Sequence, residues 1–295
     1  MAKRAICVGI NKFANFPQFA LNGCANDAKD MVALCKELLG FKASEVKQLI
    51  DAQASKASIM AQLNAAVADA KAGKLNYILF SLSSHGTQMA DTSGDEPEGM
   101  DEAFVPYDIA QKGNQWDPAT IICDDELNAL FSSLPSGVLL EVYLDTCHSG
   151  SGLRGAEFSL TAPRPRFIAP PIGELQGAVK QRRVRGFSLQ SRSATAPAKK
   201  SAANRPAQDA DRGPASNNHI LWTGCKADQT SADAYINGRY CGAFTHHFIK
   251  VMRESQNKLS RRDVVAKVRA LLKGGFSQVP QLEGNATLRN AAIVY

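Results

Sequence analysis

Three short apolar segments restrict most strongly what this chain can fold into. Residues 4–10 (RAICVGI), 76–83 (NYILFSLS) and 138–145 (VLLEVYLD) are apolar almost throughout, which is typical of strands buried on both faces. Helix-like segments alternate with them at 26–39, 56–72, 125–134, 244–254 and 262–272, and shorter strand-like segments occur at 46–50, 219–223 and 288–295. This alternation predicts a mostly parallel sheet with helices on both faces.

One region interrupts the alternation. Residues 154–214 contain 12 Lys and Arg against 4 Asp and Glu, and they hold 7 of the 13 prolines. Such a composition is typical of a linker or insertion, here between parts 1–153 and 215–295 of one domain. A solvated linker, a tether to nucleic acid or an anionic surface, and a protease-accessible loop all fit it, although no aromatic residues are interleaved to stack on bases.

The remaining composition excludes several classes of protein. No apolar run approaches the roughly 18 residues of a membrane span, and the run at 5–10 is too short for a secretion signal, so we expect a soluble, cytoplasmic protein. The 7 cysteines are odd in number and form no C-x-x-C, which favours neither a disulfide scaffold nor a structural zinc site.

Reactive residue types follow two of the buried strands. The strand at 76–83 leads into SSHG (83–86), and the strand at 138–145 leads into DTCHSG (145–150). Ligands of such sheets bind beyond the carboxyl ends of the strands. A cysteine there can act as a nucleophile, and a histidine on the neighbouring loop can accept its proton. Cys147 alone fits a buried apolar side chain better than a nucleophile, but His85 and Cys147 together predict a catalytic pair.

Two carboxylates near this pair suggest a cation-binding role. Asp145 lies two residues before Cys147, on the same side of the strand, where its charge disfavours a thiolate. We therefore expect Asp145 to bind a cation such as the Arg or Lys side chain of a substrate. Asp27 stands at the start of the 26–39 helix, where a carboxylate can equally cap the helix or complement its dipole.

An acidic loop provides a candidate metal site. Residues 91–102 (DTSGDEPEGMDE) contain six carboxylates and no basic residue, and Asp124, Asp125 and Glu126 follow later. Dense carboxylate oxygens favour Ca²⁺, although their spacing does not fit an EF-hand. An ordinary solvated acidic loop explains the same composition.

The chain resembles the type I metacaspases, which are caspase-like cysteine peptidases. The resemblance covers nearly the whole chain outside the linker and rests on LNGCANDA (21–28), SSHGTQ (83–88), SGDEPEGMDEAFVPYD (93–108), IICDDEL (121–127), LDTCHSGS (144–151), WTGCKADQTSADA (222–234), GAFTHHFIKVM (242–252) and FSQVPQL (276–282). It implies a caspase-like three-layer α/β/α sandwich with a mostly parallel central sheet.

The resemblance also implies a cysteine endopeptidase that works through a thioester acyl-enzyme. Cys147 would be the nucleophile and His85 the general base, and the backbone N–H groups of Gly86 and Cys147 would stabilise the oxyanion. The family usually has Gly before the catalytic His, and this chain has Ser84, which narrows the backbone freedom at that position.

The same resemblance implies a preference for basic residues. Asp27 and Asp145 would form an acidic pocket, lined also by Ser83, for the Arg or Lys before the scissile bond. The expected partners are therefore protein or peptide substrates with Arg or Lys at the cleavage site, with no nucleic acid and no membrane. The resemblance further implies a monomer.

Family members commonly need Ca²⁺, and the resemblance maps its ligands onto Asp101, Asp124 and Asp125. A further acidic ligand is expected seven residues after the nucleophile, where this chain has Arg154. Glu157 is a substitute candidate. The sequence therefore predicts a calcium site that Arg154 weakens.

Three further hypotheses follow. A peptidase that cuts after basic residues and has a basic linker is expected to cut itself there, near Arg183, Arg185 or Lys200. An alternative is a catalytically silent caspase-like scaffold that its basic linker tethers to an acidic partner. A third reading is a caspase-family peptidase with another primary specificity.

Overall fold

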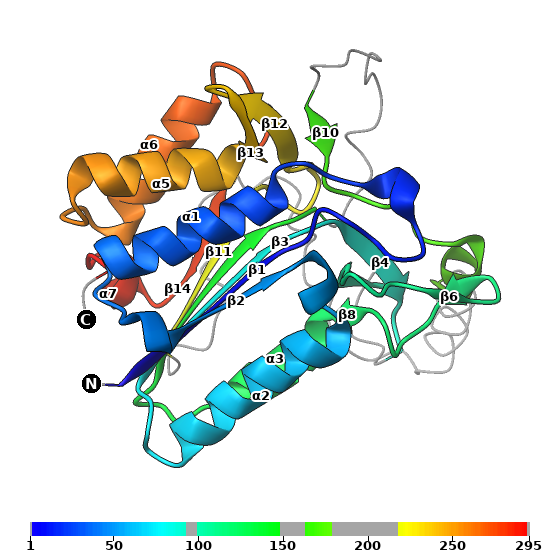
Figure 1. Cartoon of the computed structure of the whole chain (residues 1–295), viewed down its shortest axis with the longest axis horizontal. Coiled ribbons are helices and arrows are strands. Elements are labelled where there is room, and N and C mark those ends of the chain that lie inside the picture. The colour runs from blue at the N-terminus through cyan, green and yellow to red at the C-terminus, as the bar shows by residue number, and fades with distance from the viewer. Residues whose placement is uncertain (1, 93–98, 148–162, 179–217, 294–295) are drawn as a thin grey trace, which may run out of the picture.

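A six-stranded sheet in the order β14-β11-β9-β3-β1-β2 forms the centre of the computed structural model (Figure 1). The structure describes residues 2–92, 99–147, 163–178 and 218–293. The strands are β1 (Lys3–Gly9), β2 (Val46–Ile50), β3 (Tyr77–Ser83), β9 (Leu139–Asp145), β11 (His219–Thr223) and β14 (Gln281–Gly284). All neighbours are parallel except β11 and β14, so the predicted mostly parallel sheet is confirmed.

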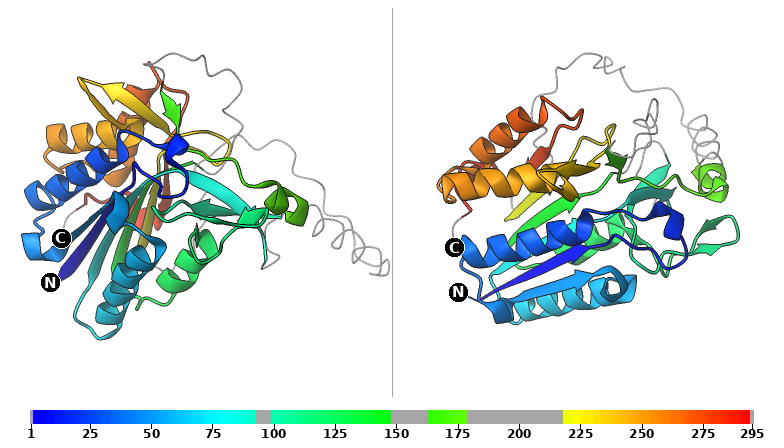
Figure 2. Two further views of the ribbon diagram at one scale, coloured as in Figure 1. Left: turned by 45° about the vertical axis from the view of Figure 1, so that its right-hand side comes forward. Right: turned by 45° about the horizontal axis from the view of Figure 1, so that its top comes forward.

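Helices cover both faces of this sheet, as the caspase-like three-layer sandwich requires. Figures 1 and 2 show α1 (Cys24–Glu37), α5 (Ala243–Ser255) and α6 (Arg261–Leu272) on one face, and α2 (Lys56–Lys71) and α3 (Asp124–Ser132) on the other. Successive residues of β1 alternate between the layers: Ala5 and Cys7 join the cluster under α1, and Ile6 and Val8 join the cluster under α2. Within the described residues, no helix is both long and apolar enough to cross a membrane.

A buried ion pair joins the sheet to the α1 layer. Arg261 Nε donates to Glu141 Oε1 at 2.6 Å, and both side chains are at most 1% exposed. Tyr77 and Trp222 donate to the same carboxylate, at 3.0 and 3.3 Å. Because each acceptor oxygen has a donor, this charge is compensated inside the core.

Smaller sheets lie beyond the carboxyl ends of the parallel strands (Figure 1). One contains β4 (Gly86–Ala90), β5 (Met100–Phe104) and β8 (Ile122–Cys123), and another contains β10 (Arg164–Pro165), β12 (Ala232–Ile236) and β13 (Arg239–Gly242). A third is the hairpin of β6 (Gln111–Lys112) and β7 (Gln115–Trp116). These elements surround the end of the sheet where the strand-end residues lie.

Two expectations from the sequence differ from the structure. The strand predicted at 288–295 is wrong over its described part, 288–293. The helix α7 (Ala286–Arg289), which Asn285 caps, covers the first two of these residues, and the edge strand is the earlier β14. β14 has a single buried residue, Leu282, and therefore lacks an apolar run. Residues 163–178 of the predicted linker pack against the body of the protein, with Arg166 fully buried.

Candidate active site

The parallel register of β3 and β9 brings the two strand-end motifs together. Ser83 pairs with Asp145 as the last residue of each strand. His85 follows Ser83 by two residues and Cys147 follows Asp145 by two residues, so both reach the same edge of the sheet. His85 is 4% exposed and Cys147 is fully buried.

One ring nitrogen of His85 is fixed by the backbone. Nε2 lies 2.7 Å from the carbonyl oxygen of Phe19, which only accepts, so Nε2 carries the proton and Nδ1 is the basic nitrogen. Nδ1 is buried and has no hydrogen-bond partner. Burial, to which the rings of Phe13 and Phe19 contribute, lowers the pKa of His85 to about 4. His85 is therefore neutral at pH 7 and able to accept a proton.

The thiol of Cys147 lies against Ser231, the residue before β12, and a neighbouring cysteine. Its Sγ accepts from the backbone N–H of Ser231 and lies 3.5 Å from the Ser231 carbonyl oxygen. Cys147 also packs with Phe167 and Cys225. Because Nδ1 of His85 has no partner, the thiol and the imidazole are not hydrogen-bonded to each other in this state.

Two backbone N–H groups converge on one carbonyl oxygen beside this pair. The N–H of Gly86 and the N–H of Cys147 donate to the carbonyl of Arg166, at 2.9 and 3.3 Å. These are the two groups to which the resemblance to type I metacaspases assigns the oxyanion. Two donors aimed at one oxygen are the arrangement that stabilises a developing oxyanion at a carbonyl carbon.

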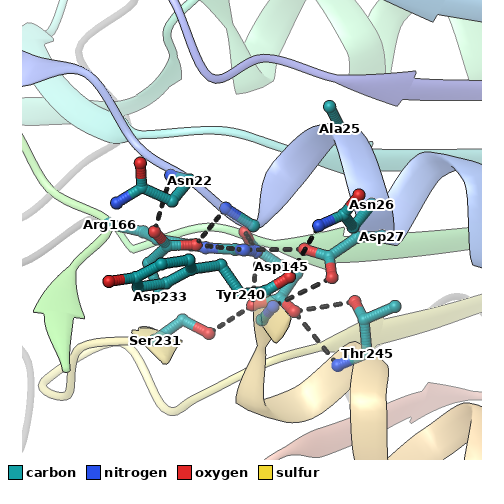
Figure 3. Close-up of polar contacts among 12 residues, drawn as sticks. Asn22, Ala25, Asn26, Asp27, Asp145, Arg166, Ser231, Asp233, Tyr240 and Thr245 are labelled. Carbon is teal, nitrogen blue, oxygen red and sulfur yellow. Dashed lines mark hydrogen bonds and ion pairs between the residues drawn. The ribbon is translucent and has the colours of Figure 1, made fainter. Parts of the chain in front are cut away.

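The side chain of Arg166 enters a pocket of three carboxylates, Asp27, Asp145 and Asp233, which we call the three-carboxylate pocket (Figure 3). Its Nη2 lies 2.6 Å from Asp27 and 3.1 Å from Asp233, and its Nη1 lies 3.2 Å from Asp145. All four side chains are at most 1% exposed. Ser83 makes none of the described contacts with this guanidinium.

Backbone and hydroxyl donors hold each carboxylate in place. Asp27, in the first turn of α1, accepts from the N–H of Gly242 at 2.9 Å. Asp145 accepts from Thr245 Oγ1 at 2.7 Å and from the hydroxyl of Ser231, and Asp233 of β12 accepts from the N–H groups of Asn22 and Gly23. Figure 3 shows Asn22, Ser231 and Thr245 among these donors around the pocket.

The charge of the pocket is far from balanced. Three buried carboxylates face one guanidinium, and burial raises the pKa of Asp27 to about 7 even though Arg166 opposes the shift. Space is limited as well: a Cβ at Gly242 would lie 2.6 Å from Arg166 Nη1 and closer still to Asp145. The pocket is thus shaped and charged for a planar cation.

The candidate calcium residues gather at a second place. Asp101 of β5 and Asp124 of α3 lie 3.6 and 3.4 Å from the thiol of Cys123, while Asp125 is half-buried. Burial and neighbouring carboxylates raise the pKa values of Asp101 and Asp124 to about 6. Within the described residues, no three His, Cys, Asp or Glu side chains form a group that could hold a metal ion.

Sequence reasoning missed Asp233 and Arg166. Asp233 lies in the quoted motif WTGCKADQTSADA but has no sequence signal of its own, and Arg166 is one of many basic residues in the predicted linker. Arg154 and Glu157, and the proposed cleavage positions Arg183, Arg185 and Lys200, lie outside the described residues.

Comparisons with known proteins agree with this geometry. Residues 2–291 match the caspase domain family of peptidases. Metacaspase-1 of Scheffersomyces stipitis is 31% identical over 95% of this chain and 70% of its own length, and Metacaspase-1 of Meyerozyma guilliermondii is 31% identical over 96% and 69%.

Solved structures give the same fold. A crystal structure of a Geobacter sulfurreducens protein superposes with a TM-score of 0.64 at 26% identity, covering 99% of this chain and 97% of that one. Caspase-1 of Spodoptera frugiperda, at 12% identity and a TM-score of 0.55, covers 96% of this chain and 87% of its own and shares the fold.

Proposed function

The chain belongs to the caspase-domain family of cysteine peptidases, and from that premise we propose that it is an endopeptidase that cleaves after Arg or Lys. The observation that supports this specificity is Arg166. Its carbonyl accepts from two N–H groups beside Cys147 while its guanidinium contacts three carboxylates. A substrate arginine bound in the same way has its carbonyl carbon next to the nucleophile.

The proposed mechanism uses the residues at the strand ends. Nδ1 of neutral His85 accepts the thiol proton as Cys147 Sγ attacks the carbonyl carbon. The N–H groups of Gly86 and Cys147 stabilise the oxyanion, and the imidazolium then protonates the leaving amine. Water hydrolyses the thioester, which releases a carboxylate and restores the thiol.

Arginine fits the pocket better than lysine or aspartate. The planar guanidinium presents two nitrogens that contact Asp27, Asp145 and Asp233 at once, whereas an ammonium is a single point charge. An aspartate side chain would bring a fourth carboxylate into the buried cluster and be repelled. We therefore expect the order Arg above Lys, with Asp rejected.

Hydrolysis of fluorogenic peptides ending in Arg, Lys or Asp tests this proposal. We expect release after Arg and Lys that Cys147→Ala abolishes, with Cys35→Ala, which replaces another fully buried thiol, as the matched control. An arginyl electrophile should label Cys147. Absence of both hydrolysis and labelling would favour the silent scaffold, and equal hydrolysis after Asp would favour a different primary specificity.

Calcium binding is a second proposal for the acidic residues. Carboxylate oxygens suit Ca²⁺, and no Lys or Arg within the described residues pairs with Asp101 or Asp124, but these two form an incomplete ligand set. Bound Ca²⁺ would supply the missing positive charge between β5 and α3. We expect Ca²⁺ to raise the melting temperature of the wild type and not of Asp101→Asn; an equal rise in both would refute the site. A cytoplasmic location and a monomeric state stay predictions.

A further inference from the structure

Residues 163–168 cross the candidate active site as an extended strand. Arg164 and Pro165 of β10 pair antiparallel with Asp233 and Ala232 of β12. After them, the N–H of Arg166 donates to the Ser231 carbonyl at 3.0 Å. Addition of an extended segment to an exposed strand edge is a recurrent way of binding peptides.

The contacts continue on the other side of the Arg166 carbonyl. Phe167 forms a parallel bridge with Gly86, and the N–H of Ile168 donates to the Gly86 carbonyl at 2.9 Å. Eight residues after Arg166, buried Glu174 accepts from the N–H groups of Ala90 and Trp116, both at 2.8 Å. The chain is therefore held on both sides of a single peptide bond.

We propose that residues 163–168 are the protein's own first substrate: they block the cleft of the intact chain, and Cys147 cleaves the bond between Arg166 and Phe167. The inference rests on the proposed function. It places self-cleavage at a bond other than those expected near Arg183, Arg185 and Lys200. Arg166 is selected by its burial in the three-carboxylate pocket, whereas the neighbouring Arg164 is exposed and its Nη1 donates to the Ala20 carbonyl at 3.2 Å.

The cleavage step is an ordinary hydrolysis. Sγ of Cys147 bonds to the carbonyl carbon of Arg166, and the bond from that carbon to the nitrogen of Phe167 breaks. His85 transfers the thiol proton to that nitrogen, which becomes a new amino terminus. Water then releases Arg166 as a free carboxylate and returns the proton to the thiol.

Intact-mass spectrometry of freshly purified chains tests the cleavage. We expect fragments 1–166 and 167–295 from the wild type and from Arg164→Gln, which changes an arginine two residues away. Cys147→Ala should remain uncut, and Arg166→Gln should yield neither fragment. Cleavage only at other positions, or the same fragment pair from Arg166→Gln, would overturn the inference.

Peptide hydrolysis separates this inference from the proposed function. A wild type that hydrolyses arginyl peptides in a Cys147-dependent way but is never cut after Arg166 would overturn self-cleavage and leave the peptidase intact. If no variant hydrolyses peptides and none is cut, the peptidase and self-cleavage both fail.

Blocking of the cleft has a readout that needs no catalysis. In the inactive Cys147→Ala background, a fluorescent benzamidine should bind at least tenfold more tightly to Arg166→Gln than to the chain with Arg166, because a tethered arginine competes at an effective concentration of about millimolar. Arg164→Gln should bind it as weakly as the parent chain. Equal affinity with and without Arg166 would overturn the blocking role.

Discussion

Asp27 offers the sharpest test of how arginine is recognised. Its Oδ2 lies 2.6 Å from Arg166 Nη2, the shortest of the guanidinium's three ion pairs, and its Oδ1 accepts from the Gly242 N–H. The Asp27→Asn substitution keeps the shape and allows the amide oxygen to keep the Gly242 bond. Above its pKa of about 7, where Asp27 is ionised, the substitution removes one buried charge, and it turns one acceptor toward the guanidinium into a donor.

The magnitude follows from this geometry. A hydrogen bond to a charged group contributes about 1.5–3 kcal/mol, and truncating one partner of a fully buried pair costs more. Asp145 and Asp233 remain to share the cation, so we expect a loss of about 2–3 kcal/mol in the transition state. This corresponds to a fall of roughly 30- to 150-fold in kcat/KM for an arginyl peptide.

A double-mutant cycle isolates the charge interaction. The Asp27→Asn change is combined with replacement of the peptide's arginine by citrulline, a neutral analogue of nearly the same shape, and all enzymes carry Arg166→Gln so that the chain's own arginine does not compete. We expect the substitution to affect the arginyl peptide strongly and the citrulline peptide by less than about threefold. An equal loss for both peptides would refute the reasoning and assign Asp27 to the start of α1 instead.

Three further predictions concern the rest of the site and the core. Because burial lowers the pKa of His85 to about 4, Nδ1 stays neutral well below the ordinary pKa of 6.5, and the rate at which Cys147 reacts with a small uncharged electrophile, which does not use the three-carboxylate pocket, should fall only as the pH approaches 4; a midpoint near 6.5 in that pH–rate profile would contradict this. Gly242→Ala should abolish cleavage after Arg yet leave the thiol reactive toward a small uncharged electrophile, since the new Cβ enters the guanidinium's space; unchanged arginyl-peptide hydrolysis would contradict this. Arg261→Ala leaves Glu141 buried without its cation and should lower the free energy of unfolding by about 3–5 kcal/mol in urea denaturation; a loss below about 1 kcal/mol would contradict this.

Local patterns in the sequence were sufficient for the sheet and for the positions of the reactive pair. The segments before Ser83 and Asp145 are apolar because helices cover both faces of β3 and β9, and such strands leave a direct compositional signal. Since parallel strands end at the same edge, the sequence alone is enough to place His85 and Cys147 together.

The blocking segment could not be predicted in this way. β10 has two residues, and one of them is proline, so it has neither strand length nor periodicity. Its position depends on Asp27 and Asp233, which lie 139 and 67 residues from Arg166 along the chain. Composition around Arg166 therefore indicates a linker, and contacts with residues distant in the sequence determine where it binds.

The same contacts that recognise a substrate also hold the intact chain closed, which links specificity to activation. The peptide bond between Arg166 and Phe167 joins the segment held in the three-carboxylate pocket to the segment held by the hydrogen bonds of Glu174. Neither segment can therefore leave the cleft alone. Hydrolysis separates the two segments: Phe167 stays on the fragment that contains Glu174, and Arg166 stays on the fragment held by β10 and the pocket. It also gives Arg166 a negative charge close to three carboxylates, which weakens its binding. A substitution that weakens arginine binding, such as Asp27→Asn, must therefore slow the cleavage of the chain itself as well as the cleavage of substrates, and uncut chain should accumulate in that variant.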